Sequence, residues 1–361
     1  MKAKNIKLMY SAMLCAVLAP FVLLACSESS VESSDIVMLK DPPSAGPVQA
    51  SLPAHEHCEA VVASVRDAGF EDEAWVTCDA GHAYIHSDSF PDHEVMKDIV
   101  GAIEQMPLPA PGYFAPIKFN PAFYGAPQTR DSSLAVAVNG IPIFDYSAGG
   151  ELTLHDLYHY QPQEDTILRK ELDPCGGHTG RGDDYHYHEL PRCMIEQMDN
   201  KDENPIIGWG FDGFPMYGND NPDGSAIATG TLDVCNGQLD PVFGYRYHTS
   251  DEYPYIIQCL VGEVGDLRAV PSIGLSSVDG GARRPASDPV FVENMTFTYE
   301  ESGEALITYE LEGESYFIGA TPTETEGCFY YSWDVIGNER GSGPGEGEYC
   351  HVIRNAGMGA P

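Results

Sequence analysis

The chain has 361 residues, of which 43% are hydrophobic and 20% charged, so it can bury a large core and is too apolar to be disordered throughout. Its net charge of −36 repels phosphate backbones, which excludes nucleic-acid binding through a basic surface and favours a cation or a small-molecule ligand as partner. The 37 glycines and 27 prolines favour a mainly β fold over a helical bundle.

Residues 1–25 are expected to be a lipoprotein signal peptide. Three lysines precede an apolar stretch that ends in Leu-Leu-Ala-Cys26, which resembles the lipobox in which the cysteine is acylated. We therefore expect lipidation at Cys26, export to the bacterial cell envelope and attachment, most simply to the outer membrane, through this lipid only. An ordinary secretory signal is the alternative. Residues 26–53 are rich in Ser and Pro and predict a flexible tether.

Residues 54–112 are predicted to form a small α+β segment. Apolar residues at helical spacing predict one helix around 61–68 and a second helix after Pro91, on Val95, Ile99 and Ile103. The Pro-rich stretch 107–112 is the candidate boundary with a larger β-rich body, residues 113–361. One continuous domain is the alternative.

The body is predicted to be a disulfide-stapled, β-sandwich-like structure with few helices. Alternating runs at 133–138 and 141–145 flank Asn139-Gly140, a strong signal for a β-hairpin. A second hairpin is expected where 290–299 and 305–311 surround a Glu-Ser-Gly-Glu turn.

Eight cysteines remain when Cys15 and Cys26 are set aside with the signal and the lipid. An even number in an exported chain implies disulfides, and sequential pairing would close four similar loops worth roughly 3 kcal/mol each. Thiolate metal ligands are the alternative, but the chain has no CxxC motif. The expected pairs are Cys58–Cys78, Cys175–Cys193, Cys235–Cys259 and Cys328–Cys350.

An internal repeat lies in the middle of the chain. Residues 173–188 (DPCGGHTGRGDDYHYH) and 233–248 (DVCNGQLDPVFGYRYH) match at six positions without a gap, and another cysteine follows each copy. The pattern predicts a duplicated, disulfide-closed strand unit with copies at 173–193 and 233–259.

The first copy carries a candidate metal site. Successive side chains of a strand face opposite ways, so His186 and His188 share one face, and His178 follows two glycines that can turn the chain back toward them. Three imidazoles suit a transition metal ion, Zn or Cu. Plain packing of structural histidines is the alternative.

The second copy has Gln238, Arg246 and His248 at the corresponding positions. If the two copies pack as pseudo-twofold partners, His188 and His248 converge on one metal ion, and Arg246 holds an anion or a carboxylate beside it. The Gln in place of a His argues against a symmetric pair of metal sites.

The motif from Tyr185 to His188, with Cys175-Gly-Gly-His178 before it and the Gly-Trp-Gly-Phe-Asp-Gly-Phe-Pro-Met-Tyr-Gly run at 208–218 after it, resembles the YHYH domain of exported bacterial proteins. The likeness continues at 232–237 and 253–255. The resemblance implies a defined unit and export, and it implies no particular reaction.

Two carboxylates are candidates for catalysis. In a metal-dependent hydrolase of an extracellular phosphoester or glycan, Asp184 or Asp212 would activate a water on the ion. Asp184 can also orient an imidazole or belong to a solvated turn, and Asp212 is most simply part of a hairpin turn. We expect a metal-binding module, with the hydrolase and a metal-free structural or adhesive surface protein as alternatives.

Residues Asn219–Ser225 fit the start of a calcium loop, because oxygen-bearing side chains alternate before a glycine. Position twelve is Gly230 instead of the glutamate that completes such a loop, which favours an ordinary polar turn.

Overall fold

The computed structural model describes residues 39–47, 53–100, 105–278, 291–338 and 341–355. The fold is mainly β, as predicted, and the strands of the described residues form four sheets. The signal peptide and Cys26 lie outside the described residues. Part of the expected tether is not free: β1 (Gly46–Pro47) pairs with β5 (Ala122–Gln128), and the Lys40 carbonyl accepts a hydrogen bond from the Val234 amide.

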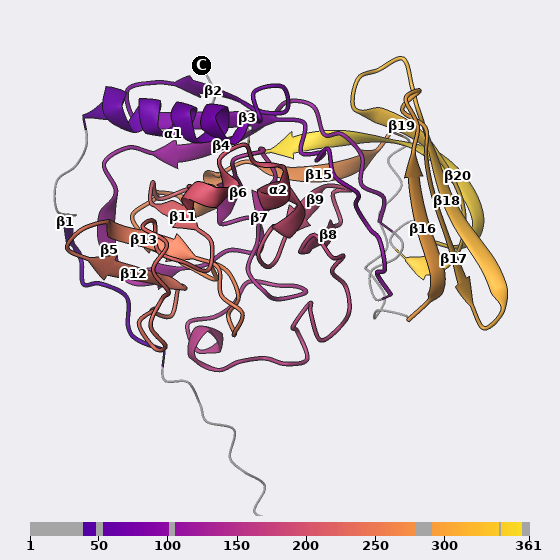
Figure 1. Ribbon diagram of the computed structural model, residues 1–361. Helices are drawn as coiled ribbons and strands as arrows, with labels where there is room; N and C mark the ends of the chain where they lie inside the picture. Colours follow the sequence, from indigo (N-terminus) through magenta and orange to yellow (C-terminus); the bar gives the residue numbers. More distant parts are fainter. Residues whose placement is uncertain (1–38, 48–52, 101–104, 279–290, 339–340, 356–361) are drawn as a thin grey trace, which may run out of the picture. The chain divides into compact units, whose positions relative to one another are not determined.

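Helix α1 (Ala54–Ala68) lies against a sheet of β2, β3 and β4 (Figure 1). It buries Val61, Val65 and Ala68, which confirms the predicted helix, and it ends at Gly69, whose positive φ of 87° suits glycine. The strands are β2 (Trp75–Cys78), β3 (His82–Ser87) and β4 (Tyr113–Lys118). Because β3 pairs with β4, strand pairing crosses the boundary expected at 107–112.

The second predicted helix is wrong over residues 91–100, which contain no helix. Val95, Met96 and Ile99 are buried, but Met96 has a φ of 60°, and its amide donates to a carboxylate oxygen of Asp173 at 2.9 Å. The apolar spacing therefore reflects burial against the repeat and not a helical face.

An eight-stranded sheet forms the centre of the described chain, in the order β12-β13-β11-β10-β6-β7-β9-β8. Its middle is the antiparallel pair β6–β10, so the sheet divides into a first half, β6–β9, and a second half, β10–β13. The Asn139-Gly140 hairpin is confirmed between β6 and β7. The strands are β6 (Ala135–Ala137), β7 (Pro142–Ile143), β8 (Gly177–Thr179), β9 (Tyr185–Tyr187), β10 (Gly208–Gly210), β11 (Pro215–Tyr217), β12 (Gly237–Asp240) and β13 (Gly244–His248).

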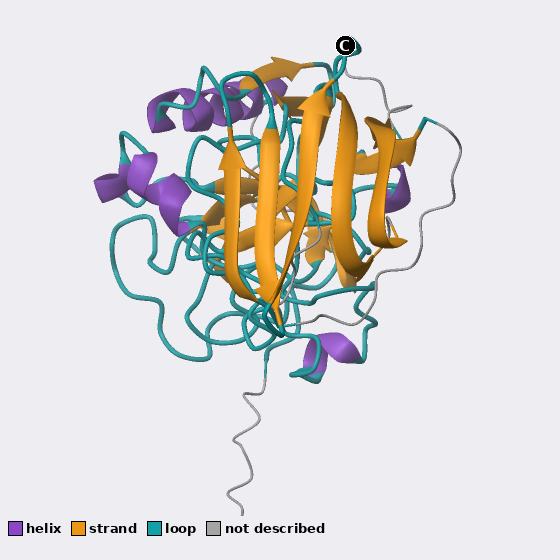
Figure 2. Ribbon diagram, turned by 90° about the vertical axis from the view of Figure 1, so that its right-hand side faces the viewer, coloured by secondary structure: helices purple, strands orange, loops and turns teal. Residues whose placement is uncertain are grey.

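The C-terminal part forms a six-stranded antiparallel sheet in the order β15-β20-β19-β18-β17-β16, seen face-on in Figure 2. The hairpin predicted around 301–304 is confirmed as β16–β17. One face of this sheet buries Ile307, Ile318 and Tyr331. The strands are β15 (Ser272–Ser277), β16 (Glu293–Tyr299), β17 (Ala305–Leu311), β18 (Glu314–Pro322), β19 (Cys328–Asn338) and β20 (Gly341–Arg354).

The remaining elements are short. Strands β5 (Ala122–Gln128) and β14 (Leu260–Gly262) complete a small sheet with β1, and α2 (Arg192–Gln197) follows the first repeat. Single turns of 3-10 helix occur at Asp156–Tyr158, Lys201–Glu203 and Leu267–Ala269.

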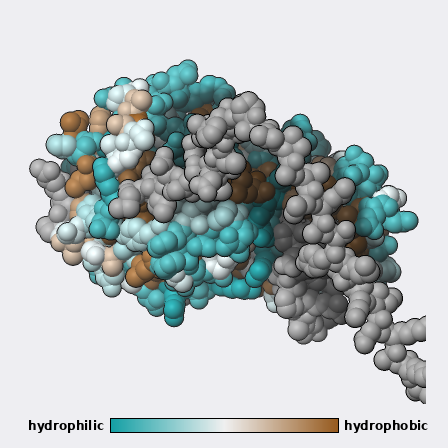
Figure 3. Space-filling view, turned by 90° about the horizontal axis from the view of Figure 1, so that it is seen from below, coloured by the Kyte–Doolittle hydropathy of each residue, from teal (hydrophilic) through white to brown (hydrophobic). Residues whose placement is uncertain are grey.

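All four sequential disulfides are confirmed. Each joins cysteines 18 to 24 residues apart, and the pairs in the repeat close the same loop in both copies. Where described residues are visible in Figure 3, hydrophilic groups predominate and hydrophobic groups are scattered among them. Within the described ranges no helix has the length and apolar character needed to cross a bilayer.

Candidate metal centre

The first-half hairpin positions the three histidines. Strands β8 and β9 are antiparallel with His178 directly opposite His186, so these two side chains share a face of the sheet. His188 lies two residues after His186 and therefore faces the same way. The alternation of strand side chains thus places three imidazoles from one hairpin on one side.

The tyrosines of the motif occupy the opposite face and anchor the hairpin in the core. The Tyr185 hydroxyl donates to the carboxylate of Asp173 at 2.9 Å, and Tyr187 accepts from the side-chain amide of Asn139 at 3.2 Å. A Cβ at Gly177 would lie 2.6 Å from the Tyr185 ring, so this position needs glycine. The packing of the tyrosines therefore determines the strand register that brings the histidines together.

The three rings form one compact, buried cluster. Their centroids are 4.8 to 4.9 Å apart, and the ligand nitrogens all lie within 4.8 Å of one another. His178, His186 and His188 are only 7%, 3% and 2% exposed. The imidazole set predicted from the sequence is thus brought together in space.

A hydrogen bond to the backbone orients the ring of His188. Nδ1 of His188 lies against the backbone carbonyl of Asp145 and donates to it, which leaves a lone pair on Nε2. This Nε2 is 3.1 Å from Nε2 of His178. Two nitrogens on a tetrahedral zinc ion, each about 2.0–2.1 Å from the metal, lie about 3.3–3.4 Å apart. The observed spacing therefore requires little movement to hold an ion.

His186 is oriented by its surroundings in the same way. Its Nδ1 is 3.2 Å from the backbone carbonyl of Asp184 and 3.6 Å from a carboxylate oxygen of the same residue. The ring of Phe144 stacks on it at 4.0 Å. A backbone or carboxylate acceptor on Nδ1 is the usual arrangement behind a metal-bound histidine, because it leaves Nε2 free for the ion.

Burial keeps the cluster in the form that binds metals. Desolvation, followed by the neighbouring imidazoles, lowers the pKa of His178 and of His188 well below the usual value, so both rings are neutral at physiological pH. Burial raises the pKa of Asp145 to about 7, opposed by hydrogen bonds from Ser147 and by the charge of His186. The carboxyl groups of Asp145 and Asp184 thus border the three imidazoles, of which His178 and His188 are neutral.

His248 and Arg246 do not join this cluster, contrary to the expected convergence of the two copies. The pseudo-twofold relation runs through the β6–β10 pair, and the hairpins β8–β9 and β12–β13 therefore lie at opposite ends of the eight-stranded sheet. His248 instead contacts Gln238, with 3.1 Å between the two Nε2 atoms. Arg246 forms an ion pair with Asp240.

Asp212 also lies in the second half and not beside the imidazoles. Its carboxylate accepts hydrogen bonds from the Tyr247 hydroxyl at 2.6 Å and from the Gly262 amide at 2.8 Å. Burial raises its pKa to about 6, which these hydrogen bonds oppose. Asp212 is thus a structural group of the hairpin turn, and of the two candidate bases only Asp184 contacts a histidine of the cluster.

The 219–225 segment forms a polar turn in which side-chain oxygens of Asn219, Asn221 and Asp223 already have partners. Asp223 accepts from the amide and hydroxyl of Ser225, and the Asn221 side-chain carbonyl accepts from Arg246 and Gln238. Two other groups of possible ligands in the described chain include disulfide-bonded cysteines, His93 with Cys175 and Cys193, and Glu348 with Cys328 and Cys350.

The sequence reasoning missed Phe144 and Asp145. Both follow β7, which pairs in parallel with β9 through Ile143 and Tyr187, a contact between segments 44 residues apart. The sequence feature that could have indicated them is an extension of the internal repeat to residues 135–145 and 208–218. These two segments share only a glycine and a proline, yet each forms a hairpin in the same half of the sheet as one copy of the repeat.

A family model described as YHYH protein matches residues 116–227. The matched segment runs from within β4 to beyond β11 and contains all three histidines of the cluster. The chain therefore carries a YHYH domain, as the resemblance implied. No curated protein and no solved structure matches the chain in the same comparisons.

Proposed function

We propose that this chain is an extracytoplasmic lipoprotein whose YHYH domain holds one transition metal ion, Zn or Cu, on His178, His186 and His188. The observation that carries the proposal is the convergence of three buried imidazoles, with Nε2 of His188 turned toward Nε2 of His178 by the Asp145 carbonyl. Imidazole nitrogens are preferred ligands of both metals, and disulfide formation removes the cysteines as competitors.

The burial of the cluster favours an ion that is held for structure, storage or sensing over a hydrolytic centre. A catalytic zinc site keeps one coordination position open to substrate, whereas these rings are 2% to 7% exposed.

The proposed location depends on two features, the disulfides and the motif at Cys26. Four disulfides are expected where an oxidising compartment maintains them, which supports export. The motif at Cys26 supports a lipid anchor in the bacterial envelope, most simply the outer membrane. Labelling with a radioactive fatty acid, lost in Cys26→Ala, tests this part separately.

The metal content of the protein purified without chelator tests the proposal. We expect about one equivalent of Zn or Cu per chain in the wild type and a loss of at least tenfold in His186→Ala and in His188→Ala, because two imidazoles hold these ions poorly. His248→Ala is the matched control, since it removes a buried histidine at the equivalent strand position of the second half.

Equal metal content in the wild type and both first-half variants would show that the ion is not held by these residues. A second readout avoids dependence on what is bound during purification: titration with Co²⁺ should give the visible absorption of a tetrahedral site in the wild type and in His248→Ala only. Absence of these bands in the wild type would contradict the proposal.

A further inference from the structure

The two halves of the eight-stranded sheet match residue by residue. Tyr185 donates to Asp173 and Tyr245 donates to Asp233, each at 2.9 Å. The amides of Cys175 and Cys235 donate to the same two carboxylates at 2.9 Å. The two halves are therefore the same scaffold built twice.

The match extends to the cluster positions. Nδ1 of His248 donates to the Gly218 carbonyl as Nδ1 of His188 does to the Asp145 carbonyl. Gln238 lies opposite Arg246 across the hairpin as His178 lies opposite His186. In both halves the last histidine has its Nε2 3.1 Å from a side-chain nitrogen across the hairpin. The two halves differ at the other two positions, where Gln238 and Arg246 correspond to His178 and His186.

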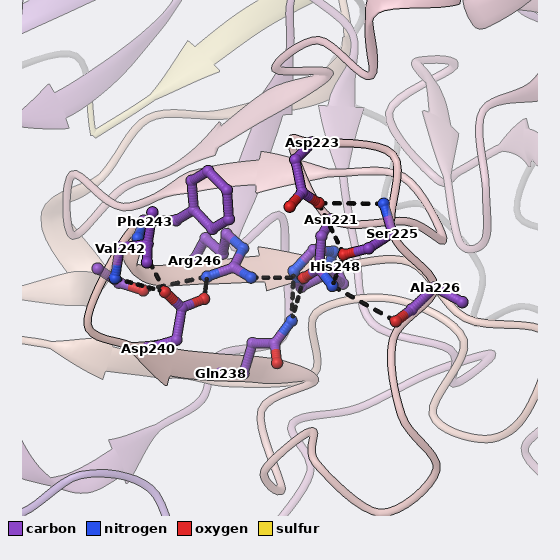
Figure 4. Close-up of polar contacts among 11 residues, drawn as sticks. Asn221, Asp223, Ser225, Ala226, Gln238, Asp240, Val242, Phe243, Arg246 and His248 are labelled. Atoms are coloured by element: carbon purple, nitrogen blue, oxygen red, sulfur yellow. Dashed lines mark hydrogen bonds and ion pairs between the residues drawn. The ribbon is translucent and has the colours of Figure 1, made fainter.

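Arg246 fills the centre of the second-half cluster, as Figure 4 shows. It is 1% exposed and donates to a carboxylate oxygen of Asp240 and to the side-chain carbonyl of Asn221. Gln238 donates to that same Asn221 oxygen at 2.9 Å, and the ring of Phe243 lies 5.1 Å from the guanidinium carbon. One guanidinium group thus joins side chains from both strands and from the 219–225 turn.

The charged residues beside the two clusters also differ. The first half has Asp145 and Asp184 next to its imidazoles, and the second half has Gly218 and Gly244 at these two positions. The half with a built-in cation lacks the two carboxyl groups, and the half with the carboxyl groups has an imidazole where the arginine lies. A cation stabilises a buried carboxylate, so the two carboxyl groups favour an ion among the imidazoles of the first half, as Asp240 pairs with Arg246 in the second.

We infer that the guanidinium group of Arg246 takes in the second half the place that a metal ion takes in the first, so that positions 178/238 and 186/246 decide which half binds metal. The inference rests on the proposed function for the first half and specifies its stoichiometry, one ion per chain. It also defines the second half as a cluster that keeps its geometry without metal.

The test is the double variant Gln238→His with Arg246→His, which recreates three imidazoles in the second half. We expect Zn²⁺ bound after dialysis to rise from one to two equivalents per chain. The single variant Arg246→His, with two imidazoles only, is the matched control and should stay at one. Far-UV circular dichroism establishes that each variant is folded.

The results distinguish failure of this inference from failure of the proposed function. A wild type with one ion and a folded double variant with one ion would overturn the role of Arg246 and leave the proposed function intact. A wild type without zinc would overturn the proposed function and, with it, the inference about Arg246, whatever the double variant binds.

The reverse exchange decides the question if the double variant does not fold. His178→Gln with His186→Arg should abolish zinc binding, and its melting temperature should be unchanged by EDTA and higher than that of the EDTA-treated wild type. A melting temperature no higher than that of the EDTA-treated wild type would show that an arginine does not replace the ion.

Discussion

The two halves of the central sheet are alike on the face that carries Tyr185 and Tyr245, and they differ at the turns of their hairpins. In the first half, the turn at 180–184 is covered at Asp183: the Asp183 carboxylate accepts from the Tyr331 hydroxyl at 2.6 Å and its backbone carbonyl from the Leu108 amide. In the second half, the matched turn is at the surface, and Val242 is 80% exposed. The same scaffold therefore supports a covered site in one place and an exposed hairpin end in the other.

This difference shows what a duplicated unit can change. The tyrosine, aspartate and glycine positions that hold the hairpin are retained in both halves, whereas the residues that meet a neighbouring layer or an ion differ. Retained residues thus belong to folding, and the diverged ones indicate function. Three predictions test this division, from the largest expected effect to the smallest.

The largest effect is expected at the covered turn. Asp183→Ala removes a fully buried acceptor and places alanine at a φ of 55°, so the free energy of unfolding should fall by roughly 3 kcal/mol. Val242→Asp at the exposed turn should change it by less than about 0.5 kcal/mol. Urea denaturation measures both, with Asp183→Asn as the control that tolerates the same φ. Equal effects of Asp183→Ala and Val242→Asp would refute the contrast.

On the face that carries the tyrosines, matched substitutions should lower the free energy of unfolding equally in the two halves. Tyr185→Phe and Tyr245→Phe each remove a buried hydrogen bond from a hydroxyl to a carboxylate, which should lower the free energy of unfolding by about 2 kcal/mol in either case. The comparison is made in the presence of EDTA, so that metal binding does not contribute. A difference above about 1 kcal/mol between the two variants would mean that the scaffolds are not equivalent.

The smallest effect concerns pH. Burial raises the pKa of Asp173 to about 6 and of Asp233 to about 7, so the folded protein binds these protons more tightly than the unfolded chain does. Their stabilising contribution is present below about pH 4 and is lost as the pH rises through 6 for Asp173 and 7 for Asp233.

Asp173→Asn and Asp233→Asn should therefore each flatten the fall in the free energy of unfolding between pH 5 and pH 8, by on the order of 1 kcal/mol. Urea denaturation at the two pH values, again in EDTA, measures this slope. Asp223→Asn is the control, because hydrogen bonds from Ser225 lower the pKa of Asp223, which places its titration below this pH range. A slope that stays the same in all three variants would contradict the raised pKa values.

Local patterns predicted a large share of the fold. Disulfide partners lie 18 to 24 residues apart, both predicted hairpins surround turns of few residues, and the three histidines belong to one hairpin. Such features depend on short loops, whose geometry the residues themselves restrict. The helix expected after Pro91 was wrong because Val95 and Ile99 are buried by long-range packing, with Met96 held by Asp173 across 77 residues.

The sequence by itself determined the alternation that places His186 and His188 on one face, the turn that returns His178 to them, and the duplication of the unit. Only the tertiary structure decided that the copies meet through β6 and β10, which separates His248 from His188, and that Phe144 and Asp145 border the imidazoles. The reason is physical: side-chain direction in a strand follows from the local backbone, whereas the order of strands in a sheet depends on which buried faces pack best among segments far apart in the chain.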